Sequence, residues 1–400
     1  MCTCAVSMGV RCNMKPERDR TLTVFLTFGM SLEGWAKAGL LSREVKLYQE
    51  LHREGMNVQL VTYGGVNDRQ WDSELDGIDV VPVYEYMSRP RTMIGQLIKS
   101  FVIPWVIEPY LSRSDLFKTN QMMGAWVAVI AKLRYRKPLL LRCGYEMSEF
   151  FRHARVSRWQ QSAGWLLSLV AYFLANQIHV ATPADRALIH RRFRIPTRKI
   201  KVWPNWIDID EFSPFSAQSE NRNGVLFVGR ISDQKNLLLL VEAIAGTDQP
   251  LLVVGDGECA NGVRKRARAL GVRVEFRGQI ANELLPEIYR QCAVYVICSR
   301  YEGNPKTLLE AMACGCAVVG TNVPGIREII AHEQNGLLVD EDPVVLRTAL
   351  LRLLADKGLR GKFAGAARQW VMQTHSLESA VIREWQTYST LFGGVATRGS

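Results

Sequence analysis

The sequence lacks the features that would place the chain inside a membrane or in a secretory pathway. No run of about 18 apolar residues is present, and the longest, residues 163–175, is interrupted by Ser168. A transmembrane helix is therefore not expected. The first residues, MCTCAVSMGVRCNMKPERDR, lack the apolar core of a signal peptide. We expect a cytoplasmic protein with a loose arm at residues 1–20.

Ordered cysteine patterns are also missing. The nine cysteines are scattered and odd in number, which fits a reducing compartment better than a disulfide scaffold. Cys2, Cys4 and Cys12 have no convincing zinc-ligand spacing. Cys314 and Cys316 flank a glycine where small residues are expected to pack. We therefore assign core or turn roles and expect no metal site.

Acidic residues are scarce in the first half of the chain. Residues 1–200 carry 28 Lys and Arg against 17 Asp and Glu, whereas residues 201–400 carry 22 of each. The excess of positive charge lies around segments 89–111, 132–137 and 151–175, where basic residues adjoin large apolar ones. This pattern suits a rim on an anionic membrane, but also a buried helix flanked by solvated arginines. Nucleic-acid binding is a third interpretation; the pI of 9.3 permits it, although no nucleic-acid motif is visible.

Apolar strands alternate with helical patterns in two series. This order predicts an α/β protein of two doubly wound, Rossmann-like domains facing across a cleft, where ligands bind at the carboxyl ends of strands. The expected strands are residues 21–29, 57–65, 78–84, 114–120, 137–144 and 176–183, then 225–230, 251–257, 273–278, 294–300, 316–321 and 336–340. The expected divisions are a first domain at 21–205, a second at 206–376, a helix at 377–392 that crosses back, and a tail at 393–400.

The strongest constellation is SRYEGNPKTLLEAMACG, residues 299–315, which follows a strand and opens a helix. Asn304 is expected to cap the helix and Pro305 to occupy its first position, so the helix start forms an anion site. Glu302 precedes the helix, and Glu310 lies about 9 Å along its axis. That separation suits gripping two ends of an elongated ligand with an anionic middle, such as a nucleotide sugar. The alternative is that Glu302 caps the helix and Glu310 faces solvent.

A second motif, VGRISDQKN, places Arg230 and Lys235 after the first strand of the second domain. This is the topological position of a phosphate site, where cations stabilise a departing diphosphate. The alternative is a solvated basic loop.

Together these motifs resemble the retaining glycosyltransferases of family 4, also called group 1, which have the GT-B fold. The matching words are WPNWIDIDEF, VGRISDQKN, LLVVGDGE, EFRGQI, SRYEGNPKTLLEAMACGCAVV and VPGIREII. They occur in the family order over residues 176–340. The first half fits more loosely, through GMSLEGWAKAGLLSREVKLYQELHREGMNV.

The resemblance implies roles for the donor side. Glu302 would contact hydroxyls of the transferred sugar and stabilise its positive transition state, while Arg230 and Lys235 hold the diphosphate. Glu310 would bind the ribose hydroxyls. The backbone of four further residues would contact the sugar and the phosphate, namely Gly303, Asn304, Pro305 and Lys306. A loop would pack on the base, namely Gly278, Gln279 and Ile280.

The acceptor side departs from the family pattern. Gly39 aligns with the second glycine of the usual pair, and Ala38 replaces the first. Cys143-Gly144 stands where relatives often have His-Gly, and Arg142 precedes it. His153 and His179 fit a helix and a strand better than this position. Arg142 either contacts a phosphate or forms an ion pair with Glu146 or Glu149.

Two further patterns suggest other chemistry. GDGECA at 255–260, with Glu275 twenty residues on, matches a dinucleotide fingerprint and supports an NAD-dependent oxidoreductase as the alternative. The match follows the second strand of its domain rather than the first. Asp208–Asp210 and Asp340–Asp342 form Asp-x-Asp pairs, for which loop capping is the better interpretation.

The sequence thus predicts a retaining, metal-independent hexosyltransferase without a cofactor, using a nucleoside-diphosphate sugar as co-substrate. A cationic, apolar first domain suggests a glycan or polyprenyl-linked acceptor in polysaccharide or lipopolysaccharide synthesis. We expect peripheral association with the inner face of the cytoplasmic membrane, and no nucleic-acid partner.

Overall fold

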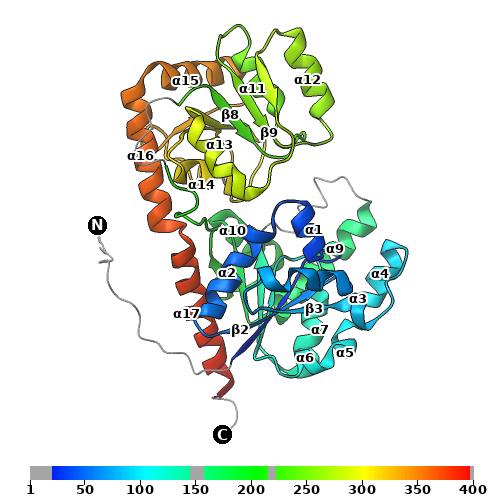
Figure 1. Cartoon of the computed structure of the whole chain (residues 1–400). Helices are drawn as coiled ribbons and strands as arrows, with labels where there is room; N and C mark the ends of the chain where they lie inside the picture. Colours follow the sequence, from blue (N-terminus) through cyan, green and yellow to red (C-terminus); the bar gives the residue numbers. More distant parts are fainter. Residues whose placement is uncertain (1–19, 145–156, 215–221, 397–400) are drawn as a thin grey trace.

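The computed structural model describes residues 20–144, 157–214 and 222–396, which form two α/β domains stacked along one axis (Figure 1). Residues 1–19 of the predicted arm, with Cys2, Cys4 and Cys12, lie outside the described residues. His153, Glu146 and Glu149 also lie outside them. The prediction of two parallel sheets with alternating helices is confirmed.

The first domain is built on a sheet of seven parallel strands in the order β3-β2-β1-β4-β5-β6-β7. Six strands match the predicted apolar runs, and the edge strand β7 was not predicted. The strands are β1 (Thr21–Phe25), β2 (Asn57–Thr62), β3 (Asp79–Pro82), β4 (Leu116–Thr119), β5 (Leu139–Cys143), β6 (Gln177–Val180) and β7 (Ile200–Val202).

Helices cover both faces of this sheet, and a separate apolar core lies between the sheet and the helices on each face. On one face the core is formed with α1 (Leu32–Lys37), α2 (Leu41–Arg53) and the C-terminal helix α17 (Leu377–Ala396). The other face carries the remaining described helices, several of them short, namely α3 (Val83–Tyr86), α4 (Met93–Ser100), α5 (Ile103–Val106), α6 (Glu108–Leu111), α7 (Ala125–Tyr135), α9 (Arg158–Leu174) and α10 (Pro183–Phe193). Helix α2 is amphipathic, since Val45, Tyr48 and Leu51 are buried at helical spacing.

The second domain has six parallel strands in the order β10-β9-β8-β11-β12-β13, all of them predicted. They are β8 (Val225–Val228), β9 (Leu251–Val254), β10 (Val274–Phe276), β11 (Val294–Ile297), β12 (Ala317–Thr321) and β13 (Leu337–Val339). Its helices are α11 (Leu237–Ile244), α12 (Ala260–Ala269), α13 (Leu285–Gln291), α14 (Lys306–Ala313), α15 (Pro343–Ala355) and α16 (Lys357–Thr374).

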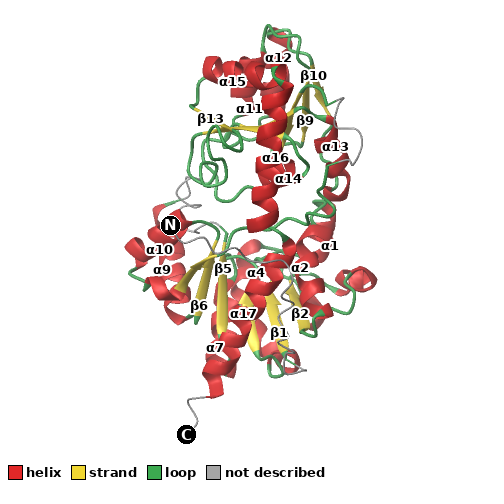
Figure 2. Cartoon of the chain, turned by 90° about the vertical axis from the view of Figure 1, so that its left-hand side faces the viewer, coloured by secondary structure: helices red, strands yellow, loops and turns green. Residues whose placement is uncertain are grey.

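The chain crosses between the domains twice, and the two crossings lie side by side. The Ile207 N–H donates to the His375 carbonyl at 2.7 Å, and the Leu377 N–H donates to the Ile207 carbonyl at 3.0 Å. Figure 2 shows α16 and α17 following one another along both domains. Helix α17 then packs against α2 and β4 of the first domain.

A buried ion pair attaches α17 to the first sheet. Lys118 of β4 is fully buried, and its ammonium donates to Glu384 at 2.6 Å and to the Tyr388 hydroxyl at 3.0 Å. Burial acts to raise the pKa of Glu384, but the Lys118 charge outweighs it, and the pKa falls to about 2. The helix is therefore fixed by charge as well as by apolar contact.

Helix α17 is longer than predicted. It continues through Ala396, whereas the sequence suggested an end at Phe392 and a tail from residue 393. Glycine in a helix costs only about 1 kcal/mol relative to alanine, so Gly393 and Gly394 do not end it. None of the described helices has the length and apolarity needed to cross a bilayer.

Candidate active site

Lys235 and Glu302 meet at the carboxyl edge of the second sheet. Strands β8 and β11 are paired in parallel, so the loops that follow them lie together. The Lys235 ammonium donates to Glu302 Oε1, which also accepts from the Ser299 hydroxyl at 2.7 Å. The Glu302 side chain is only 7% exposed and Lys235 is 22% exposed. Arg230, by contrast, is exposed on the same loop as Lys235.

The start of α14 differs by one residue from the prediction. Pro305 is the N-cap residue, and no side chain caps this helix. Asn304, which we expected to cap it, instead accepts from the Asn205 N–H at 2.9 Å, because the interdomain linker passes beside it. The first backbone N–H groups of α14 are therefore not taken up by a side chain, which suits anion binding.

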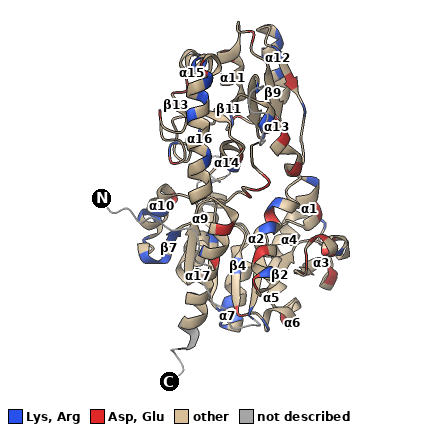
Figure 3. Ribbon diagram, turned by 60° about the vertical axis from the view of Figure 1, so that its left-hand side comes forward, with Lys and Arg blue, Asp and Glu red and all other residues tan. Residues whose placement is uncertain are grey.

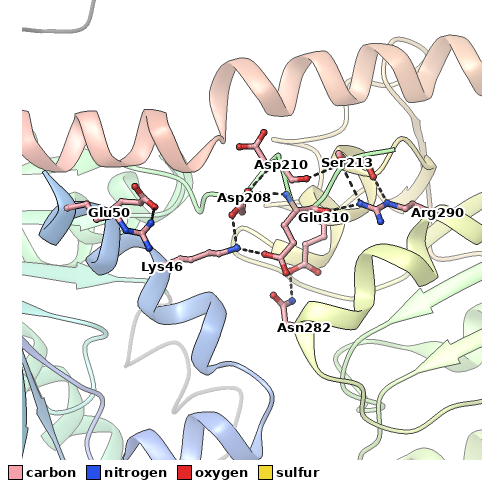
Figure 4. Close-up of polar contacts among 10 residues, drawn as sticks. Lys46, Glu50, Asp208, Asp210, Ser213, Asn282, Arg290 and Glu310 are labelled. Carbon is pink, nitrogen blue, oxygen red and sulfur yellow. Dashed lines mark hydrogen bonds and ion pairs between the residues drawn. The ribbon is translucent and has the colours of Figure 1, made fainter. Parts of the chain in front are cut away.

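Glu310 is fully buried one turn into α14, so the alternative that it faces solvent is wrong. Its carboxylate accepts from the Tyr289 hydroxyl at 2.9 Å and from Asn282 Nδ2 at 3.2 Å. Arg43 of α2 reaches it across the domain boundary at 3.7 Å. Burial, and then the Glu310 charge, raise the pKa of Tyr289, which keeps the phenol protonated. Figure 4 shows Asn282 and Glu310 pointing toward one another.

A second charged contact between the domains involves the first residue of α14. Lys306 donates to Glu44 of α2 at 2.9 Å, and Glu44 also pairs with Arg43 at 3.2 Å. Burial lowers the pKa of Lys306 to about 8, although Glu44 opposes this shift. Burial raises the pKa of Glu44, but the Lys306 and Arg43 charges outweigh it and hold the pKa at about 2. The pair is therefore charged at neutral pH.

Lys46, one turn further along α2, binds the linker. It pairs with Asp208 at 2.6 Å and with Glu211 (Figure 4). Asp208 also accepts from the N–H groups of Asp210 and Glu211, at 3.0 and 3.2 Å. Asp342 likewise accepts two N–H groups at the start of α15. Asp208 and Asp342 therefore cap their turns, as the loop-capping interpretation predicts for one member of each pair.

Arg43, Glu44 and Lys46 were not identified from the sequence. Charged residues on the polar face of an amphipathic helix usually face solvent, so the sequence gives little reason to expect contacts from these three. One signal was available, because positions 43 and 46 are three residues apart and share a helix face close to the glycine loop at Gly39.

Two glycines of the first domain touch the donor-side loops. A Cβ on Gly39, whose φ is +64°, would lie 3.1 Å from the Ala281 backbone, directly after the loop of Gly278, Gln279 and Ile280. A Cβ on Gly303 would lie 3.3 Å from the Gly144 carbonyl oxygen. The predicted acceptor-side glycines therefore face the predicted donor-side residues.

Arg142 contributes to the same boundary. Its guanidinium donates to Asn205 Oδ1 at 2.7 Å, and Asn205 in turn donates to Asn304. Arg142 thus connects the first sheet, the linker and the start of α14. Its two predicted carboxylate partners lie outside the described residues.

Cys143 points away from this boundary. It is fully buried, and its sulfur lies 3.4 Å from the Tyr172 hydroxyl in the core of the first domain. His179 lies in β6, as predicted, and stacks on Trp203 with ring centroids 4.1 Å apart. Burial lowers the pKa of His179 to about 3, so the ring is neutral at physiological pH.

We expect Cys143→Ala to retain kcat within about twofold and to lower stability by about 1 kcal/mol. The substitution removes one buried sulfur from the core and no group from the domain boundary. Steady-state kinetics and a thermal melt measure both quantities. A variant that folds normally but lacks activity would instead give this position a chemical role.

The glycines of the dinucleotide-like segment have a packing explanation. A Cβ on Gly255 would lie 2.0 Å from the Gly229 carbonyl, and one on Gly257 would lie 2.4 Å from the Ile231 carbonyl. Two loops of the second domain approach too closely there for any other residue. The motif is accounted for without a nicotinamide cofactor. Among the described residues no group of three His, Cys, Asp or Glu side chains could hold a metal.

Two glycosyltransferase family models match this chain, one on each domain. Residues 45–211 match the model described as Glycosyltransferase Family 4, and residues 208–370 match the model described as Glycosyl transferases group 1. The chain belongs to the family 4 glycosyltransferases. The two matches meet in the interdomain linker, so each domain of this glycosyltransferase matches one of the two family models.

Two relatives of the glycosyltransferase have undecaprenol-linked substrates in their names. It is 25% identical over 266 residues to GalNAc-alpha-(1->4)-GalNAc-alpha-(1->3)-diNAcBac-PP-undecaprenol alpha-1,4-N-acetyl-D-galactosaminyltransferase of Campylobacter jejuni, covering 64% of this chain and 70% of the relative. It is 28% identical over 203 residues to UDP-Gal:alpha-D-GlcNAc-diphosphoundecaprenol alpha-1,3-galactosyltransferase of Escherichia coli, covering 44% of this chain and half of the relative.

A solved structure extends the likeness to both domains. HepE of Anabaena, in complex with UDP and glucose, superimposes with a TM-score of 0.73 at 19% identity, covering 92% of this chain and 99% of HepE. The predicted GT-B fold of the glycosyltransferase is confirmed.

Proposed function

We propose that the chain is a retaining hexosyltransferase that moves a sugar from a nucleoside-diphosphate donor to a hydroxyl of a glycan or polyprenyl-linked acceptor. The observation that carries this proposal is the contact between Lys235 and Glu302 beside the uncapped start of α14. The proximity of a cation, a carboxylate and a helix N-terminus supports the proposal that a sugar diphosphate binds there.

Each donor-side residue has a proposed task. Lys235 and Arg230 stabilise the charge on the leaving diphosphate, and the backbone from Gly303 to Lys306 orients it. Glu302 contacts the sugar hydroxyls and stabilises positive charge at the anomeric carbon. These cationic groups and the helix end supply what a metal would otherwise supply, so the reaction is proposed to need neither metal nor cofactor.

Binding of the nucleoside end of the donor is proposed to require a rearrangement of the contacts made by Glu310. Glu310 is proposed to bind the ribose hydroxyls, and the loop of Gly278, Gln279 and Ile280 to pack on the base. In the described structure the Glu310 carboxylate is taken up by Tyr289 and Asn282, with Arg43 close by. Donor binding would therefore exchange at least one of these contacts for a ribose hydroxyl.

The acceptor side is assigned to the first domain. Gly39, Arg142, Cys143 and Gly144 were the candidates; Gly39 and Gly144 border the donor-side loops, whereas Cys143 would act only through packing. The two relatives named above have undecaprenol-linked substrates in their names. We extend this substrate class to the present chain, in cell-surface polysaccharide or lipopolysaccharide synthesis at the inner face of the cytoplasmic membrane. Nucleic acid is not a proposed partner.

A thermal-shift screen tests the donor proposal. We expect uridine or guanosine diphosphate, or one of their sugars, to raise Tm by several degrees, because a ligand that binds only the folded state stabilises it. Nicotinamide dinucleotides and DNA are the controls. A shift with a nicotinamide dinucleotide alone would support the oxidoreductase, and a steeply salt-dependent shift with DNA would support a nucleic-acid binder. The anomeric configuration of the product then tests retention.

A further inference from the structure

Helix α9 leaves an apolar face uncovered on the first domain. Gly164, Ser168 and Tyr172 are buried on its inner side, whereas on its outer side Trp159 is 72% exposed and Phe173 is 73% exposed. Leu166 and Val170 lie between them, and the spacings of seven, four and three residues place all four side chains along one face, over about 21 Å. The alternative of a wholly buried helix is therefore wrong.

Helices α4 and α5 carry a second exposed apolar face. Met93, Ile94 and Ile98 are mostly exposed on α4, and Phe101 and Trp105 continue the surface. Helix α5 packs against α7, and α7 packs against α9. The Trp126 indole of α7 donates to the Ser100 hydroxyl at the end of α4 at 2.8 Å, so all four helices lie on the same face of the first sheet. Figure 1 shows α4 and α9 on the same side of the first domain.

The charges around these faces have one dominant sign. Helices α4, α5 and α9 contain no Asp or Glu. Arg91 lies two residues before the start of α4, and Arg158 is the first residue of α9. Residues 157–200 carry seven basic residues and a single acidic one, Asp185. Figure 3 shows Lys and Arg gathered around α10 and β7. Lys199, just before β7, donates to the Phe173 carbonyl near the C-terminal end of α9 at 2.6 Å.

We propose that the outer faces of α4, α5 and α9 form a lipid-docking surface for an anionic bilayer. Large apolar side chains with tryptophan among them, bordered by arginine and lysine, match the acyl boundary and the headgroups respectively. A protein partner would be expected to meet acidic residues within the surface, and these three helices have none; Glu108, two residues beyond α5, is paired with Arg134. The surface deepens the proposed function, since a lipid-linked acceptor requires the enzyme to work at a membrane.

The position of α9 relates this surface to the active site. Gly144, which lies against Gly303 across the domain boundary, directly follows β5, and α9 begins fourteen residues later in the chain. We expect docking through α9 to hold the cleft near the headgroup region, where the head of a polyprenyl-linked glycan is located.

Flotation with vesicles tests the apolar part of the proposal. Vesicles of phosphatidylethanolamine with 30% phosphatidylglycerol, chosen as the probe, should carry the full-length protein upward at low salt. Trp159→Ser/Leu166→Gln/Phe173→Ser should reduce the bound fraction at least tenfold. The matched control, Val344→Gln/Leu351→Gln, removes two exposed apolar side chains from α15 of the second domain and should float like the parent.

A second arm tests the charge. Pure phosphatidylcholine vesicles should bind the parent several-fold more weakly than the anionic vesicles. Arg91→Gln/Arg158→Gln should weaken binding to anionic vesicles, whereas Lys265→Gln/Arg268→Gln on α12 should not.

Two results would overturn the proposal. One is a parent protein that stays at the bottom of the gradient with anionic vesicles, or an α9 variant that floats equally well. The other comes from analytical ultracentrifugation: a dimer that the α9 substitutions dissociate, without vesicle binding, assigns the face to a second copy of the chain. Flotation requires neither donor nor acceptor, and donor hydrolysis is measured separately on each variant. Loss of docking with intact hydrolysis, or the reverse, therefore separates this proposal from the proposed function.

Discussion

Replacing Lys235 with alanine should lower kcat at least a hundredfold, with a smaller change in KM. The ammonium contacts Glu302 and stands at the carboxyl edge where the diphosphate is proposed to leave. Removing one preorganised charge that stabilises a transition state typically costs ~10²–10³ in rate. Glu302→Ala should cause a loss of similar size, because it removes the carboxylate proposed to stabilise the cationic sugar. Initial rates with a labelled donor measure both.

The matched control is Arg300→Ala. Arg300 is a cation of the same region, but it pairs at the surface with Asp233 and with Glu341, the latter at 3.0 Å. Exposed pairs contribute little, so this variant should keep near-normal turnover and stability. If Lys235→Ala retained near-normal turnover, the diphosphate assignment would be withdrawn. A thermal melt of each variant excludes loss of the fold as the cause.

Lys118→Met should lower the free energy of unfolding by about 3–5 kcal/mol. The substitution leaves the Glu384 carboxylate buried without its ion partner, and breaking one side of a buried pair typically costs this amount. The midpoint of urea denaturation, followed by tryptophan fluorescence, measures the loss. Lys118→Met/Glu384→Leu should recover most of it, since no uncompensated charge remains. A single variant as stable as the parent would show that the pair does not hold α17.

The pH dependence provides an independent check on the same pair. The pKa of Glu384 is about 2 in the folded protein, against an ordinary value of 4.5. A depressed carboxyl pKa contributes stability that is fully present above pH 4.5 and lost as the pH falls toward 2. The double variant should therefore lose less stability than the parent across this window.

The strands could be predicted because both sheets are parallel and covered on both faces. Such strands read as continuous apolar runs, as in VLFV and LLVV. Strand β7 was missed because it has only three residues, lies at the sheet edge and carries an exposed Lys201 between Ile200 and Val202. The end of α17 was placed too early because its glycines suggested a terminus that the helix does not have there.

The central contact of the candidate site, between Lys235 and Glu302, could be predicted from the strand order of the second sheet. Lys235 and Glu302 come after neighbouring strands of one sheet, so their proximity could be predicted without coordinates. The contacts of Arg43 and Glu44 could not, because they depend on how the second domain sits against α2. Asn304 was assigned to the wrong partner for the same reason, since its hydrogen bond goes to Asn205 of the linker, 99 positions away.

The two interdomain crossings are joined through Ile207 along one side of the molecule, so we expect them to form the hinge line of any movement between the domains. Any widening of the gap between the domains must turn about that line, and it must first separate Gly39 from Ala281 and Lys306 from Glu44. On the proposed function, the escape of a spent nucleoside diphosphate would be coupled to the rupture of these contacts, and weakening them should change how fast the enzyme resets between turnovers.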